Sequence, residues 1–407
     1  MADTEPLHDT NTPTAAGLDV VLRTKLSVMM FLQYAVWGAW WVVLGKYLGT
    51  IGFTDQNIGS VYGTMAIASI FSPLVFGQIA DRWVPTQYLL AFLHLAGAGA
   101  LYVTVQYTYY ASFHACVLIY ALLYIPTISL TNSLSLHQIS DAAKHFPGIR
   151  VFGTIGWIVS GLFVGWRLNE SSVEPIQLAI GLSVLMGLFC FVLPHTPPTG
   201  KAGDALPFIR ALGLLKNRTF ALFTFVSFII SIVLAGYYAF TAIFLADIGV
   251  EKAAGVMTIG QFAEVLLLPF LPFFLKHLGM KWTLVLGMAA WGIRYCIFSL
   301  GQPVGLVIVS LALHGICYDF FFVAAYIHVD NQASKAIRAS AQALFNLVTM
   351  GLGMWLGNIF FGELVAHYRT EDIVAWSSVW ATPTIGVVIA LVIFIVGFRE
   401  NKPAGNT

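Results

Sequence analysis

The chain has 407 residues, of which 58% are hydrophobic and 10% are charged, and its formal net charge is +1. An ordinary soluble domain has about 25% charged residues, so this composition argues against a soluble globular protein and predicts an integral membrane protein. No basic cluster with interleaved aromatic residues occurs in the sequence, and we therefore expect no nucleic acid partner.

Apolar runs of about 20 residues recur from end to end, and each is long enough to cross about 30 Å of hydrocarbon as a helix. The runs are continuous rather than alternating, which favours helices over the strands of a membrane barrel. We predict an all-α protein in the lipid bilayer with twelve transmembrane helices, at residues 26–48, 56–79, 86–107, 111–137, 148–168, 175–194, 220–246, 253–276, 281–300, 304–329, 337–365 and 376–397.

One substantial hydrophilic connection divides these spans into two sets of six. It covers residues 195–218 and contains Pro197, Pro198, Gly200 and Gly203, and we expect its second part, residues 207–216, to form a short helix on the membrane surface. The expected organisation is a disordered cytoplasmic tail, a first six-helix half, a cytoplasmic linker, a second six-helix half and a cytoplasmic tail, at residues 1–24, 25–194, 195–218, 219–398 and 399–407.

The basic residues are distributed unequally between the two sides of the membrane. With both termini inside, the outer loops hold Lys46, Arg167, Lys252 and Arg369, Arg294 lies within the ninth span, and the other Lys and Arg residues fall on the inner side. Lys and Arg accumulate in cytoplasmic loops. The pattern predicts a plasma (inner) membrane protein with cytoplasmic termini.

The two sets of six also resemble each other. Pro73 precedes Asp81 by the same interval as Pro269 precedes His277, and each pair ends the second span of its half. Two similar, pseudo-symmetric halves joined by a basic linker are typical of the major facilitator fold, in which the ligand site lies between the halves near the midplane of the membrane.

The segment that ends the second span resembles the cytoplasmic loop motif of the major facilitator superfamily. Gly77, Asp81 and Arg82 occur there in the sequence GQIADR. The resemblance implies that the Asp and the Arg help to lock the two halves in one conformation. A plain charge pair in a loop is the alternative interpretation.

The eighth span carries a carboxylate, Glu264, near its middle. An ionisable side chain at that depth costs roughly 3 kcal/mol, so it is retained where it faces a cavity or a partner. Gln261 lies three residues earlier and therefore on the same helix face. An amide and a carboxylate together suit a polar, uncharged ligand, whereas a structural ion pair inside the helix bundle is the alternative.

The tenth span adds His314, Tyr318 and Asp319 in the sequence HGICYDFF. His314 and Tyr318 share a face, and Asp319 lies about 100° further round the helix. A buried carboxyl group can bind and release a proton, so we expect Glu264 and Asp319 jointly to couple transport to protons. An isolated core or cavity histidine would also explain His314.

Candidate ligand contacts also occur in the fifth and seventh spans. Arg150, Thr154 and Trp157 line one face of the fifth span, and Tyr237 and Tyr238 lie in the seventh. The aromatic rings suit stacking against a planar ligand. The alternatives are a cytoplasmic-end anchor for Arg150, a lipid-facing position for Trp157 and simple packing for the two tyrosines.

Arg294 lies within the ninth span, in the outer half of the membrane by its distance from Lys281. There it could reach the membrane interface or neutralise Glu264 or Asp319. Of these possibilities we favour a structural role.

Several kinds of site are missing from the sequence. No cluster of basic residues lies at membrane depth to clamp a phosphate group, and no Walker motif, HExxH pattern or convincing nucleophile and base pair occurs. We therefore expect no catalytic residue, no metal site and no cofactor, with the proton gradient as the source of energy.

Five motifs together identify a family. FLQYAVWGAW, FPGIRVFGTIGW, TIGQFAE, HGICYDFF and IRASAQ resemble the nucleoside:proton symporter family of the major facilitator superfamily, and the chain looks most similar to its nucleoside transporter branch. The resemblance covers nearly the whole chain. It implies that the candidate residues of spans five, eight and ten face one cavity, where the amide and the acids hydrogen-bond ribose and base while aromatic rings stack on the base.

One segment departs from the family pattern. Nucleoside-carrying members look as though the seventh span supplies side-chain amides, whereas this chain has Ala235, Gly236, Tyr237 and Tyr238 there. The main hypothesis is a proton-coupled nucleoside importer that works by alternating access and functions as a monomer. Symport of another neutral polyol or glycoside and a non-transporting membrane sensor are the alternatives.

Overall fold

The computed structural model describes residues 19–198, 200 and 206–400, and nearly all of its elements are helices. The α-helices are α1 (Val20–Gly38), α2 (Leu44–Thr50), α3 (Asp55–Arg82), α4 (Thr86–Thr104), α5 (Tyr110–Gln138), α6 (Ala142–Arg167), α7 (Glu174–Phe189), α8 (Arg218–Asp247), α9 (Ala253–Leu267), α10 (Leu271–Leu300), α11 (Val304–Ser310), α12 (Leu313–Cys317), α13 (Ala324–Gln332), α14 (Arg338–Asn346), α15 (Met354–His367) and α16 (Trp376–Gly397).

Short elements of other kinds connect or interrupt these helices. The 3₁₀ helices are η1 (Cys190–Val192), η2 (Pro207–Lys216) and η3 (Leu268–Phe270), and the π-helices are η4 (Tyr318–Val323) and η5 (Leu347–Gly353). The strands β1 (Arg369–Thr370) and β2 (Ile373–Val374) form an antiparallel pair in which Arg369 faces Val374. We did not expect this hairpin from the sequence.

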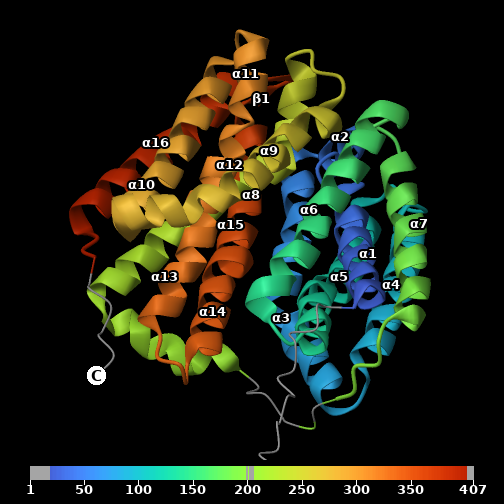
Figure 1. Cartoon of the computed structure of the whole chain (residues 1–407). Coiled ribbons are helices and arrows are strands. Elements are labelled where there is room, and N and C mark those ends of the chain that lie inside the picture. Colours follow the sequence, from blue (N-terminus) through green and yellow to red (C-terminus); the bar gives the residue numbers. More distant parts are fainter. Residues whose placement is uncertain (1–18, 199, 201–205, 401–407) are drawn as a thin grey trace, which may run out of the picture.

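The helices form two bundles (Figure 1). In the first, α1 packs on α6 and α7, and α5 packs on α3 and α4. In the second, α10 packs on α16, α8 on α15, and α9 on α12. A helix is confirmed at residues 207–216 as the 3₁₀ helix η2, which packs on α14 and α8 of the second bundle, and its location at the membrane surface stays a prediction.

Ten helical segments of the described residues are long and apolar enough to cross a membrane, whereas we expected twelve spans. The expected first span is divided into α1 and α2 by a turn at residues 39–43. The expected eighth and ninth spans run together as Ala253–Leu300, which changes direction at Gly279 (φ 74°, ψ 174°). Glycine adopts this positive φ without steric cost, so Gly279 can join two helices that run in different directions.

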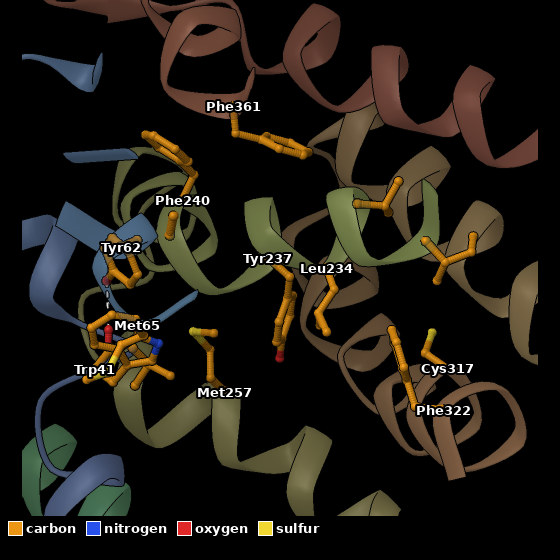
Figure 2. Close-up of a cluster of buried hydrophobic side chains, with 14 of the residues drawn as sticks. Trp41, Tyr62, Met65, Leu234, Tyr237, Phe240, Met257, Cys317, Phe322 and Phe361 are labelled. Atoms are coloured by element: carbon orange, nitrogen blue, oxygen red, sulfur yellow. Dashed lines mark hydrogen bonds between the residues drawn. The ribbon is translucent and has the colours of Figure 1, made fainter. Parts of the chain in front are cut away.

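The turn in the first span keeps its buried backbone groups hydrogen-bonded through a side chain of α3. The Tyr62 hydroxyl donates to the carbonyl oxygen of Trp41 at 2.7 Å and accepts from the backbone N–H of Gly45 at 3.0 Å. Buried backbone groups need such partners. Figure 2 shows Tyr62 beside Trp41, with the hydrogen bond between them.

The beginning of the first helix corrects one sequence prediction. The expected disordered tail extended to Thr24, but α1 begins at Val20. The Asp19 carboxylate accepts hydrogen bonds from the backbone N–H groups of Val21 and Leu22, and such a cap stabilises a helix start. Residues 1–18 of that tail, residues 199 and 201–205 of the linker and residues 401–407 lie outside the described part of the chain.

The hydrophobic core continues from one bundle into the other. In Figure 2, Trp41, Tyr62 and Met65 of the first bundle and Tyr237, Phe240 and Phe361 of the second belong to one cluster of buried side chains. The bundles therefore share a packed interface in this conformation.

Charged contacts join the two bundles at one end, which we call the latch end and define by Lys46, Asp55, Glu170 and Arg369. The Arg369 guanidinium donates two hydrogen bonds to Asp55, Nε to Oδ2 at 2.6 Å and Nη2 to Oδ1 at 2.8 Å. This bond raises the pKa of Arg369 above its ordinary value. Such a two-point pair between a guanidinium and a carboxylate is strong and directional.

Glu170 completes the latch end on the other side of α2. Its carboxylate accepts from Lys46 Nζ at 2.7 Å and from the backbone N–H groups of Ala253 and Ala254 at 3.0 and 2.8 Å. These N–H groups begin α9, where a negative charge also interacts favourably with the helix dipole. The first bundle thus holds the start of α9 in the second. The opposite end, which carries Arg82 and η2, we call the linker end.

Candidate functional site

The candidate site begins with α9, because this helix packs against α6 of the other bundle. Gln261 is 7% exposed and Glu264 is half-buried on α9. Within the described residues the Glu264 carboxylate has no hydrogen bond or ion pair. It does lie within electrostatic reach of Arg150 on α6. The alternative of a structural ion pair for Glu264 is therefore not what the structure contains.

Arg150 is half-buried on α6 and packs over a ring that the sequence analysis did not single out. The guanidinium carbon lies 4.1 Å from the centre of the Tyr34 ring, on α1. Gly153 permits this arrangement, since a Cβ at that position would lie 2.7 Å from both Arg150 Nη1 and Tyr34 Cδ2. Tyr34 is also within electrostatic reach of Glu264. Arg150 and Tyr34 therefore form the wall opposite Glu264.

Trp157 continues this wall along α6. Its ring meets the Trp37 ring of α1 edge to face, with centroids 5.3 Å apart. Trp157, Trp37 and Thr154 are all half-buried. Thr154 shares the α6 face of Arg150 and Trp157 by its spacing. The structure thus places the three candidate residues of the fifth span on the side of α6 that meets α1.

Three rings from the second bundle are stacked in a column, which we call the ring column: Tyr237, His314 and Tyr318. The His314 ring lies 4.9 Å from the Tyr237 ring at an interplanar angle of 18°, and 5.8 Å from the Tyr318 ring at 27°. Tyr237 and His314 are fully buried, whereas Tyr318 is half-buried. Of the three, Tyr318 is the one that keeps exposed surface in this conformation.

Tyr238 and Tyr318 both lie near Glu264. Each is within electrostatic reach of the Glu264 carboxylate, and Tyr318 is also within reach of Arg150. Tyr238 is half-buried and meets Tyr237 edge to face at 5.5 Å. The structure therefore brings Arg150, Glu264, Tyr238 and Tyr318 together between the two bundles.

Asp319 lies next to this group but is completely buried. Its exposed fraction is 0%, and neither carboxylate oxygen has a hydrogen-bond partner. It interacts electrostatically with Glu264. Asp319 occurs in the π-helix η4, and single π-turns within α-helices are frequent at functional sites. An unpartnered buried carboxylate is costly in its charged form, which makes Asp319 suited to binding a proton.

Arg294 does not neutralise either acid. It is fully buried on α10, and its guanidinium packs against the rings of Tyr237 and Trp291 at 4.3 and 4.2 Å. Its Nη1 donates to Nδ1 of His314 at 3.1 Å. The idea of an ion pair with Glu264 or Asp319 is therefore wrong in this conformation, because the guanidinium is enclosed by aromatic rings instead.

A second group that the sequence analysis missed is a buried polar network in the first bundle, which we call the Gln33 network. Gln33 Nε2 donates to Thr127 Oγ1 at 2.7 Å, and Gln33 Oε1 lies 2.9 Å from His94 Nε2. The Tyr124 hydroxyl donates to the Gln33 carbonyl oxygen at 2.7 Å. The network fixes α1 directly beside Tyr34. The available signal was the polar Gln33 within the apolar FLQYAVWGAW run.

The residues of the expected cytoplasmic loop motif lie at the linker end, away from this group. Gly77, Asp81 and Arg82 end α3, and the Asp81 carbonyl oxygen accepts a hydrogen bond from the backbone N–H of Gly200 at 2.9 Å. This contact joins α3 to the linker. The locking role of the motif stays a prediction.

Together, the site offers aromatic surfaces, one amide, one guanidinium and the Glu264 carboxylate between the bundles, with the Asp319 carboxyl group buried behind them. Such a set suits a planar, polar ligand that has no charge of its own.

Comparisons with known proteins agree with this chemistry. The family model described as "Nucleoside H+ symporter" matches residues 20–403. The protein named "Putative nucleoside transporter YegT" of Escherichia coli strain K12 is 39% identical over 93% of this chain and 94% of its own length. "Nucleoside permease NupG" of the same organism is 32% identical over 88% of this chain and 91% of its own length.

A solved structure agrees as well. The crystal structure of the nucleoside transporter NupG superposes with a TM-score of 0.86 at 30% identity, over 93% of this chain and 100% of that one. The chain therefore has the major facilitator fold predicted from its sequence.

Proposed function

The chain belongs to the nucleoside H+ symporter family, and on that premise we propose that it carries a nucleoside together with a proton, by alternating access, through the site between its two bundles. The observation that carries the proposal is Glu264. This carboxylate lies between the bundles, has no ion pair within the described residues and faces Arg150 of the opposite bundle.

Each group of the site has a proposed role in holding the ligand. The ring of Tyr318 and the rings of Trp157 and Tyr238 offer surfaces for the base, because flat heteroaromatic groups stack on such side chains. Gln261, Thr154 and Arg150 offer hydrogen bonds to the ribose and to polar atoms of the base. Tyr237 and His314 lie behind this surface and support the Tyr318 ring by stacking. Asp319 also lies behind it and affects Glu264 electrostatically.

Proton coupling is assigned to Glu264 and Asp319. A negative charge on both acids at once is unfavourable, since they interact electrostatically and Asp319 has no other partner. Proton uptake from the acidic side removes one charge and lets the bundles rearrange around the ligand. Proton release on the other side restores the charge and favours the return of the empty carrier.

The latch end is the closed end in this conformation. Lys46, Asp55, Glu170 and Arg369 hold the bundles together there, and Figure 1 shows the bundles close together at α2 and β1 and farther apart toward the linker end. By the distribution of Lys and Arg, we propose that the latch end faces outward, that both termini are cytoplasmic and that the protein resides in the inner membrane.

We also propose that the chain is a carrier and not an enzyme, that it needs no cofactor besides the proton gradient and that one copy is sufficient. Each chain contains both bundles and hence a complete site between them.

The test is uptake of radiolabelled uridine into proteoliposomes that contain the purified protein, with and without an inwardly directed proton gradient. Stimulation of uptake by the gradient is expected, and a proton ionophore should abolish it. Thermal-shift measurements with nucleosides, free bases and sugars give the ligand class, since a ligand that binds the folded state stabilises it. Stabilisation by sugars alone would favour a polyol or glycoside carrier, and binding without uptake would favour a sensor.

A further inference from the structure

Arg294 is a basic side chain buried inside the second bundle, and it forms no ion pair with Glu264 or Asp319. Its exposed fraction is 0%, and its Nε and Nη2 atoms have no hydrogen-bond partner. Burying a guanidinium is costly unless its contacts compensate. The guanidinium packs on the rings of Tyr237, Trp291 and Tyr295, and its Nη1 is bonded to His314 Nδ1 at 3.1 Å.

The hydrogen bond fixes the state of the imidazole. A guanidinium has only N–H donors and stays charged. His314 Nδ1 must therefore accept with its lone pair, and the proton of the neutral ring resides on Nε2. The fully protonated ring has no lone pair on Nδ1 and would place a second positive charge beside Arg294. The contact is thus compatible with one tautomer of His314.

The same contacts fix the position of the ring. Arg294 packs on the Tyr237 ring at 4.3 Å while it binds His314, so it holds the first two rings of the ring column in register. On the other side, α9 lies against the histidine: a Cβ at Gly260 would be 2.9 Å from His314 Cβ. The glycine thus lets α9 pack closely on His314, and the third ring, Tyr318, stacks on the imidazole.

Tyr318 is the half-buried end of this column and lies near Glu264 and Arg150. We propose that Arg294 is a positioning residue for ligand binding: by its hydrogen bond to His314 it fixes the ring column, whose accessible end, Tyr318, is the surface on which a planar heteroaromatic ligand stacks. This inference rests on the proposed function for the ligand class, and it assigns to Arg294 a task that is separate from proton coupling.

The first test is spectroscopic and needs no ligand. In protein labelled with nitrogen-15 in histidine, the signals of His314 are assigned by their loss in the His314→Gln variant. The expected result is the Nε2–H tautomer in the wild type. The Nδ1–H tautomer or a fully protonated ring would overturn the proposal, because neither can accept from Arg294.

The second test is the affinity for uridine, measured by isothermal titration calorimetry. Arg294→Met should lower the affinity about tenfold, as expected for loss of a hydrogen bond that involves a charged group. Arg294→Lys keeps a donor and should recover most of the affinity. Arg338→Met is the matched control: Arg338 is 46% exposed, pairs with Asp330 and should leave the affinity unchanged.

A double variant distinguishes positioning from general destabilisation. If Arg294 acts through Tyr318, then Arg294→Met in a Tyr318→Leu background should cost little further affinity, because the two residues act as a unit. Full additivity of the two losses, or unchanged affinity in Arg294→Met, would overturn the proposal. If Arg294→Met does not fold, Tyr237→Leu removes the other end of the column and should lower the affinity in the same non-additive way. A wild type that binds no uridine while showing the Nε2–H tautomer would contradict the proposed function and leave the placement of the ring column supported.

Discussion

The Gln33 network of the first bundle and the Asp319 and Arg294 side chains of the second differ in how their buried polar groups are hydrogen-bonded. In the first, each polar group of the Gln33 network has a hydrogen-bond partner, and none of the bonding groups is a carboxylate or a guanidinium. In the second, the buried Asp319 carboxylate has no partner, and two of the three guanidinium nitrogens of Arg294 have none. A satisfied network rigidifies its surroundings, whereas an unsatisfied charge is sensitive to protons and to conformation.

The difference suggests a division of labour. The first bundle provides a fixed wall, Tyr34, Arg150 and Trp157, held by packing and by the Gln33 network. The second bundle provides the acids, whose charges can change, and the ring column, which Arg294 holds in register. Variants that remove single contacts or charges from each bundle test this division, and the largest effect on stability is expected in the first bundle.

The largest effect is expected for Gln33→Leu. This change removes the partner of His94 Nε2 and one of the two partners of Thr127 Oγ1, which still donates to the Tyr124 carbonyl oxygen. A buried imidazole nitrogen is left unpaired, so the free energy of unfolding should fall by about 3 kcal/mol. Thermal unfolding in detergent measures the loss. Gln106→Leu changes an exposed glutamine and should stay within about 0.5 kcal/mol of wild type. Equal stability of the two variants would mean that the network does not hold the first bundle together.

A smaller effect is expected for Asp55→Asn at the latch end. The variant weakens the two-point contact with Arg369. The closed state of the latch end should be destabilised by about 1 to 2 kcal/mol, and the packing within each bundle should be unaffected. Ile58, which is buried and lines a pocket of about 490 Å³ at this end, reports the opening.

For that measurement, Ile58→Cys is combined with replacement of the four native cysteines by serine. A membrane-impermeant thiol reagent should label Cys at this position faster in Asp55→Asn than in the parent protein. Asp330→Asn, which weakens the exposed pair with Arg338, serves as the control and should not change the rate. Labelling that is equally slow in all three proteins would show that Asp55 does not close the latch end.

The smallest effect on stability is expected for Asp319→Asn. Since this carboxylate has no hydrogen-bond partner to lose, neutralising it should leave the free energy of unfolding unchanged or raise it by up to about 1 kcal/mol. The matched carboxylate is Glu170, which has three partners, so Glu170→Gln should be destabilising under the same conditions. A large loss in Asp319→Asn would contradict the contrast between the bundles.

The sequence was informative where placing a residue in an apolar span costs free energy. Glu264 and Arg150 were identified because ionisable side chains in apolar spans need a reason to be there, and the structure brings the two within electrostatic reach. The two helix faces followed from spacing alone: Gln261 lies beside Glu264, and His314 stacks on Tyr318. The fold followed from the length and continuity of the apolar runs.

Other features depend on contacts between residues that are distant in the chain. Arg369 and Asp55 are 314 positions apart, so no local pattern indicates their pairing. Tyr34 is an uncharged aromatic residue in an apolar run, where such a residue is common, so the sequence does not mark it as a site residue. The sequence favoured a structural role for Arg294 but could not indicate its neighbours, because the rings of Tyr237 and Trp291 that enclose it are brought there by the fold.

The central claim is that Glu264 and Asp319 of the second bundle couple transport to protons. The most direct measurement is uridine uptake into proteoliposomes with and without an inwardly directed proton gradient, for Glu264→Gln, Asp319→Asn and, as a control, Glu363→Gln, which changes an exposed acid of the same bundle. We predict that the gradient stimulates uptake by the wild type and the control and has little effect on the two site variants. Stimulation of both site variants to the wild-type extent would contradict the claim.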